Sequence, residues 1–136
     1  MSQPLTWLQE HHPIVLVVDD NPAIRDMVSW ALELDGYEPV EAAEGQEALA
    51  WMDNAAREGR YPSVILLDLA MPVMDGNTFL CRLRERAETV ETPPAVVVIT
   101  AMAGPESQAL NVQQVIVKPF HVRDLLDVVR KLALPA

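Results

Sequence analysis

Residues Val15–Pro22 read VLVVDDNP, a run of aliphatic side chains that ends in two adjacent carboxylates. A run that is short and apolar throughout predicts a β-strand buried on both faces. Asn21 suits a helix N-cap and Pro22 suits the first helical position, so a helix should follow directly. Asp19 and Asp20 repel each other, and burying them costs free energy unless a cation compensates. The stretch therefore predicts a strand–turn–helix unit whose turn is either a cation site or a solvated loop.

The same alternation of apolar runs and amphipathic stretches continues along the chain. Further strands are expected over 37–43, 64–67, 95–99 and 115–117. Helices are expected over 22–35, 45–58, from 76 onward, over 108–111 and over 122–132. Pro39 indicates that the strand carrying it lies at a sheet edge. Strands alternating with helices predict an α/β fold with a mostly parallel sheet and helices on both faces.

Length and composition limit the classes of function. The chain has 136 residues, which suits one domain, and with 50% hydrophobic but only 5% aromatic residues its core should be aliphatic. A net charge of −10 argues against direct nucleic-acid binding and against anionic membranes. The single cysteine, Cys81, allows no intramolecular disulfide. With no membrane-spanning run and no signal peptide evident, we expect a cytoplasmic protein that binds proteins or cations.

Polar residues follow four of the predicted strands. They are Asp19, Asp20, Asp68, Thr100 and Lys118. Ligands of parallel α/β sheets bind at the carboxyl ends of the strands, so these side chains should converge. Three carboxylates need a counter-charge, and oxygen ligands suit Mg²⁺. A carboxylate can act as a nucleophile toward phosphorus, while a metal, an ammonium and a hydroxyl stabilise the phosphoryl oxygens. The set therefore predicts phosphoryl transfer to an aspartate.

Four motifs in this order resemble the bacterial response-regulator receiver domain of two-component signalling. They are VVDDNP at 17–22, DLAMPVMDG at 68–76, TA at 100–101 and KPF at 118–120. The resemblance covers residues 13–134 and leaves 1–12 as an N-terminal extension. It implies a flavodoxin-like fold with a five-stranded parallel sheet in the order 2-1-3-4-5.

The resemblance also implies a role for each site residue. Asp68 matches the phosphoacceptor, which is also a metal ligand. Asp20 matches the direct Mg²⁺ ligand, and Asp19 the acid that reaches the ion through water. Ala70 matches the position whose backbone carbonyl binds the ion. Thr100 matches the switch hydroxyl.

At the end of the last strand, Lys118 matches the lysine that pairs with the phosphate. The family usually holds the peptide bond to Pro119 in the cis form. Two features depart from the family pattern. Val115 stands where a tyrosine or phenylalanine is usual, and the segment from Thr100 to Lys118 is shorter by roughly four residues, about one helical turn. Both departures concern the relay of the signal rather than the phosphorylation chemistry.

The function implied is a phosphoacceptor that receives its phosphoryl group from a histidine kinase or phosphotransfer protein. It would signal to a downstream protein through the last helices and catalyse only its own phosphorylation and dephosphorylation. The alternative is an atypical receiver that binds partners without phosphorylation, which Val115 and the short segment favour. A metal-dependent phosphatase would want an acid at position 70 to protonate a leaving group, and Ala70 offers none. No nucleotide-binding P-loop occurs in the sequence.

Overall fold

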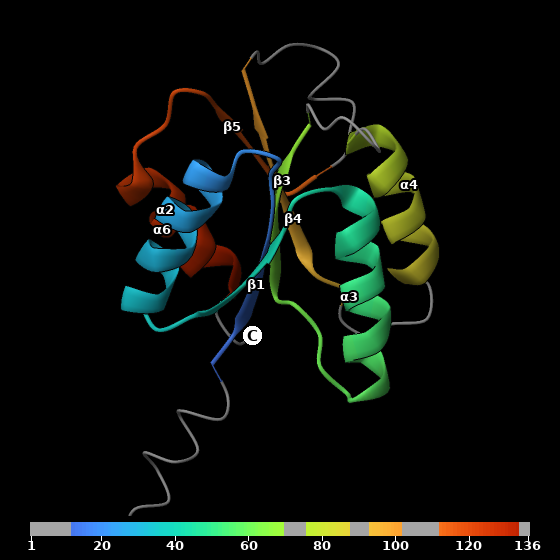
Figure 1. Ribbon diagram of the computed structural model, residues 1–136. Helices are drawn as coiled ribbons and strands as arrows, with labels where there is room; N and C mark the ends of the chain where they lie inside the picture. The colour runs from blue at the N-terminus through green and yellow to red at the C-terminus, as the bar shows by residue number, and fades with distance from the viewer. Residues whose placement is uncertain (1–11, 70–75, 88–92, 102–111, 134–136) are drawn as a thin grey trace, which may run out of the picture.

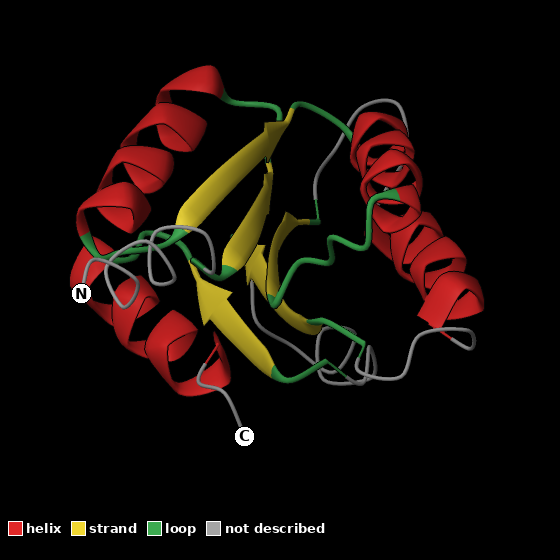
Figure 2. Cartoon of the chain, turned by 90° about the horizontal axis from the view of Figure 1, so that it is seen from below, coloured by secondary structure: helices red, strands yellow, loops and turns green. Residues whose placement is uncertain are grey.

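A central parallel sheet lies between two layers of helices in the computed structural model, which describes residues 12–69, 76–87, 93–101 and 112–133 (Figures 1 and 2). The strands are β1 (Ile14–Val18), β2 (Glu38–Ala42), β3 (Val64–Asp68), β4 (Ala95–Thr100) and β5 (Gln114–Val117). The helices are α2 (Pro22–Leu34), α3 (Gly45–Arg57), α4 (Gly76–Ala87) and α6 (Val122–Ala133). The strand order is β2-β1-β3-β4-β5, and all pairs are parallel. The predicted fold class and strand order are confirmed.

The buried side chains form two clusters, one on each face of the sheet. Leu16 and Val18 of β1 belong to the cluster under α3 and α4. Val15 and Val17 point to the opposite face and belong to the cluster under α2 and α6. Successive residues of a strand point to opposite faces, so a strand covered on both faces must be apolar at every position. This explains the continuous aliphatic run at the start of the chain.

Residues at both ends of α2 determine where this helix begins and ends. The Asn21 side chain accepts hydrogen bonds from the amides of Ala23, at 3.0 Å, and Ile24, at 3.3 Å. These contacts satisfy amides that the first helical turn leaves without partners. At the other end of α2, Gly36 has a φ of 90°, a left-handed conformation that glycine adopts without strain. The chain therefore enters and leaves α2 where the sequence predicts.

Two strands end on residues that were predicted as site residues. β3 ends at Asp68 and β4 at Thr100, each one residue beyond its predicted apolar run. β2, which contains Pro39, lies at the sheet edge as expected. The helix predicted over 108–111 lies outside the described residues. Within the described residues, no helix has both the length and the apolar character needed to span a membrane.

Candidate functional site

An acidic cluster lies where β1 and β3 end side by side. Asp19 directly follows β1 and Asp68 is the last residue of β3, and these two strands pair in the sheet. One carboxylate oxygen from each of Asp19, Asp20 and Asp68 lies within 4.8 Å of the others. Asp19 and Asp68 are only 3% and 4% exposed, whereas Asp20 is exposed. The sheet thus brings together all three carboxylates that the sequence predicted to converge.

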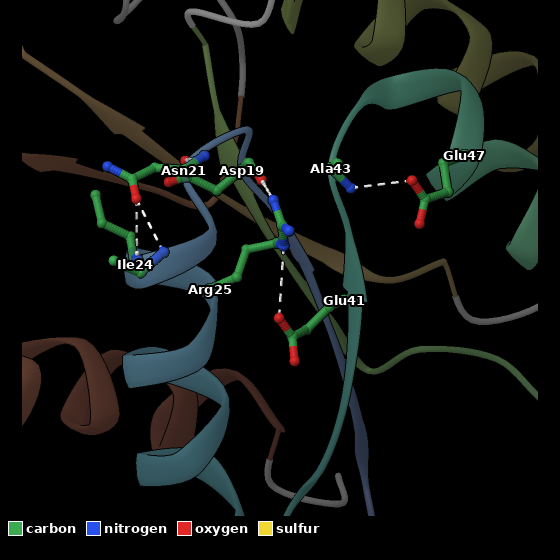
Figure 3. A network of polar contacts seen from close by, with 8 residues as sticks. Asp19, Asn21, Ile24, Arg25, Glu41, Ala43 and Glu47 are labelled. Atoms are coloured by element: carbon green, nitrogen blue, oxygen red, sulfur yellow. Dashed lines mark hydrogen bonds and ion pairs between the residues drawn. The ribbon is translucent and has the colours of Figure 1, made fainter.

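Asp19 is held in place by contacts on several sides (Figure 3). Its amide donates to the carbonyl of Ala42 on β2 at 3.1 Å. Its Oδ1 accepts a hydrogen bond from the Asn21 amide at 2.9 Å. Its backbone carbonyl accepts one from Arg25 Nη1 at 2.6 Å. The position of this acid is therefore set by the surrounding protein.

The ammonium of Lys118, the residue directly after β5, faces the cluster. Its Nζ lies 3.5 Å from Asp68 Oδ2, and its side chain is 28% exposed. The Lys118 amide donates to the carbonyl of Thr100 at 2.7 Å, which ties the end of β5 to the end of β4. The Lys118–Pro119 peptide bond is cis, as the family resemblance implied. Asp68 and Thr100 thus end two neighbouring strands and Lys118 directly follows the next one, all at one end of the sheet.

The charges of the cluster are unbalanced. Burial is the main cause that raises the pKa of Asp19, and the nearby Asp68 and Asp20 raise it further. The Asn21 amide and Lys118 act in the opposite direction and lower it. Among the described residues, three carboxylates face the Lys118 ammonium, and this excess of negative charge favours binding of a cation. An all-oxygen donor set with few protein ligands fits Mg²⁺, which usually keeps several waters.

A pocket of about 390 Å³ lies between α2 and the segment that follows β5. It is lined by Ile24 and Met27 of α2 and by Lys118, Pro119 and Phe120. Its walls are mostly apolar, and they come from segments far apart in the chain. This pocket could not be predicted from the sequence, because no local pattern indicates that the two segments meet.

Residues 15–130 of the sequence match the response regulator receiver domain family. The chain belongs to this family. The receiver domain is 37% identical over 126 residues to the positive alginate biosynthesis regulatory protein of Pseudomonas aeruginosa. That alignment covers 89% of this chain and 47% of the relative, so the chain spans about half the length of that protein.

Solved structures resemble the receiver domain over most of their own length. Chemotaxis protein CheY4 of Vibrio cholerae is 34% identical, with a TM-score of 0.75, and the match covers 90% of this chain and 99% of that one. Response regulator protein TrrA of Thermotoga maritima, solved in complex with Mg²⁺-BeF, is 27% identical with a TM-score of 0.71. That match covers 88% of this chain and 98% of TrrA.

The receiver domain places most of the predicted site residues together. Asp19, Asp20, Asp68 and Lys118 converge, and Thr100 ends the neighbouring strand. Ala70 lies outside the described residues. Arg25 was not among the predicted site residues; its contact with the Asp19 carbonyl spans one turn of helix and the preceding loop. Its only sequence signal is a cation shortly after an acidic pair, which is too common to single out.

Proposed function

We propose that this receiver domain accepts a phosphoryl group on Asp68 with Mg²⁺ bound at the acidic cluster. The observation that carries the proposal is the meeting of three carboxylates within 4.8 Å, with the Lys118 ammonium 3.5 Å from Asp68. Asp20, Asp68 and the backbone carbonyl of Ala70 would bind the ion directly, and Asp19 would reach it through water. The related TrrA, crystallised with Mg²⁺-BeF, supports this assignment.

The donor would be a phosphohistidine of a histidine kinase or phosphotransfer protein. A carboxylate oxygen of Asp68 attacks phosphorus, a P–O bond forms and the P–N bond breaks. The released histidine nitrogen keeps the electron pair and takes up a proton. Mg²⁺, when bound, neutralises negative charge on the phosphoryl oxygens. Lys118 would pair with one of those oxygens, and the Thr100 hydroxyl would donate to another.

Hydrolysis would return the domain to its starting state. Water attacks phosphorus and the P–O bond to Asp68 breaks. Inorganic phosphate leaves, and the Asp68 carboxylate is regenerated. While it lasts, the phosphoryl group adds about −1.5 to −2 charges at neutral pH. Thr100 ends β4 and Lys118 directly follows β5, the two strands that precede α6, so their movement toward the phosphoryl group would alter the face that includes α6. A downstream protein would read that face.

Incubation with Mg²⁺ and acetyl phosphate, followed by intact-mass measurement, tests the proposal. The wild-type protein should gain the mass of one phosphoryl group, and chelation of Mg²⁺ should abolish the gain. Asp68→Asn should stay unmodified. Asp127→Asn, a matched change at an exposed aspartate of α6, should be labelled like the wild type. An unmodified wild type, or equal labelling of Asp68→Asn, would refute the assignment.

A second candidate is a receiver that binds its partner without phosphorylation. Val115, at the position where the family usually has an aromatic residue, is half-buried against the core cluster under α3 and α4. An aliphatic side chain fixed there cannot perform an aromatic rotamer switch. For this function, partner affinity should be the same with and without beryllofluoride, a phosphoryl mimic. A change in affinity would favour the phosphoacceptor.

A further inference from the structure

Arg25 on α2 contacts the acidic site although it is not one of the predicted ligands. Its side chain is 18% exposed, and Nη1 donates to the backbone carbonyl of Asp19 at 2.6 Å. Its Nε lies 3.5 Å from Oε1 of Glu41 on β2. Figure 3 shows the guanidinium between these two partners. One side chain therefore connects α2, the end of β1 and the edge strand.

The carbonyl that Arg25 contacts belongs to the peptide that joins the two adjacent acids. This peptide is planar, so holding the Asp19 oxygen also orients the amide and Cα of Asp20. Asp20 is exposed, and the core does not hold its side chain as it holds Asp19 and Asp68. The relative direction of the two neighbouring carboxylates thus depends on the plane that Arg25 fixes. The ion pair with Glu41 keeps the guanidinium aimed at that carbonyl.

We infer that Arg25 is a positioning residue of the metal site, which orients the Asp19–Asp20 peptide so that both carboxylates can serve one Mg²⁺ ion. This inference rests on the Mg²⁺ role proposed above. Residues that orient metal ligands without touching the metal commonly govern its affinity.

Orientation by Arg25 and simple charge repulsion predict opposite changes in Mg²⁺ affinity when Arg25 is removed. A guanidinium beside a cation site repels the cation, so removal of its charge should tighten Mg²⁺ binding if charge alone mattered. If Arg25 acts by orientation, its removal should weaken binding. The direction of the change therefore separates the two explanations.

Calorimetric titration of the full chain with Mg²⁺ provides the test. Arg25→Gln should bind Mg²⁺ about 10-fold more weakly than the wild type. Arg25→Lys should lie between the two, because an ammonium can donate to the carbonyl but lacks the second arm toward Glu41. Arg60→Gln is the matched control: it removes the same charge and an ion pair with Glu38, at the opposite end of β2 from the site. It should bind Mg²⁺ like the wild type.

Amide hydrogen exchange without Mg²⁺ gives a second readout. The Asn21 amide, which donates to Asp19 Oδ1, should exchange faster in Arg25→Gln than in Arg60→Gln. Equal or tighter Mg²⁺ binding by Arg25→Gln would overturn the inference and leave the proposed function intact. A wild-type protein that binds no Mg²⁺ would overturn both.

Discussion

Asp19 is 3% exposed, and burial is the main reason why its pKa lies above the ordinary value of 3.8. A carboxyl group whose pKa is raised in the folded state binds a proton more tightly in the folded protein than in the unfolded chain. Ionisation of Asp19 therefore decreases the free energy of unfolding. This decrease is absent below pH 3.8 and reaches its full size once the pH exceeds the raised folded-state pKa. At neutral pH without metal, the ionised Asp19 therefore lowers the free energy of unfolding.

The variant Asp19→Asn should consequently be more stable than the wild type at pH 7 in the presence of a chelator. The amide keeps an oxygen that can accept from Asn21, so the hydrogen bond at this position survives the change. Urea titrations at several pH values would measure the difference, which should shrink as the pH falls from the raised folded-state pKa toward 3.8 and vanish below 3.8. Asp26→Asn, at an exposed position on α2, should show no such gain. A destabilised Asp19→Asn under these conditions would contradict the assigned cost.

At the scale of elements, α2 and α6 are joined by a two-armed ion pair. Arg130 on α6 donates from Nε and Nη2 to the two oxygens of Asp35, each at 2.8 Å. Asp35 follows the last turn of α2. The hydrogen bonds from Arg130 are the main cause that lowers the pKa of Asp35 below 3.8. The contact therefore stabilises the packing of the two helices on their shared face of the sheet.

This ion pair predicts a defined pH dependence. A lowered folded-state pKa gives a contribution that is present above pH 3.8 and is lost as the pH falls through the folded pKa. Asp35→Asn should thus be less stable than the wild type at pH 7, and the two should converge in acid. Thermal unfolding from pH 7 down to pH 2 would show this. Asp127→Asn removes a single-armed contact to Arg130 within α6 and should have a smaller effect. An Asp35→Asn deficit that persists unchanged in acid would exclude the ion pair as its cause.

For the whole molecule, the acidic cluster proposed to bind Mg²⁺ exists only when the sheet is formed. Its carboxylates come from the ends of β1 and β3, which are separated by β2 and two helices in the chain. An unfolded chain cannot hold these groups together, so Mg²⁺ should bind the folded state selectively and stabilise it.

We therefore expect Mg²⁺ at 100 times its dissociation constant to raise the free energy of unfolding by about 2.7 kcal/mol. Differential scanning calorimetry with Mg²⁺, and again after chelator is added, would measure the effect. Sodium chloride at equal ionic strength controls for screening. Asp68→Asn, which lacks one of the three carboxylates, should gain little. An equal gain with sodium chloride would refute specific binding.

Local patterns in the sequence determined the elements and most of the site. Strands such as β1 could be recognised because burial on both faces demands an unbroken apolar run. Asp19, Asp20, Asp68, Thr100 and Lys118 could be selected because each follows or ends such a run. Strand ends in a parallel sheet share one edge, so their convergence could be predicted without coordinates.

Only the tertiary structure decided which side chains touch. The contacts of Arg25 with the Asp19 carbonyl and Glu41 depend on how α2 packs beside β2. The pairing of Arg130 with Asp35 likewise depends on α2 and α6 covering the same face. Local periodicity tells which face of an element is buried, but contacts between distant residues depend on side-chain geometry after packing. The sequence by itself therefore determined the fold and the strand-end carboxylates that meet, and packing determined which side chains hold them in place.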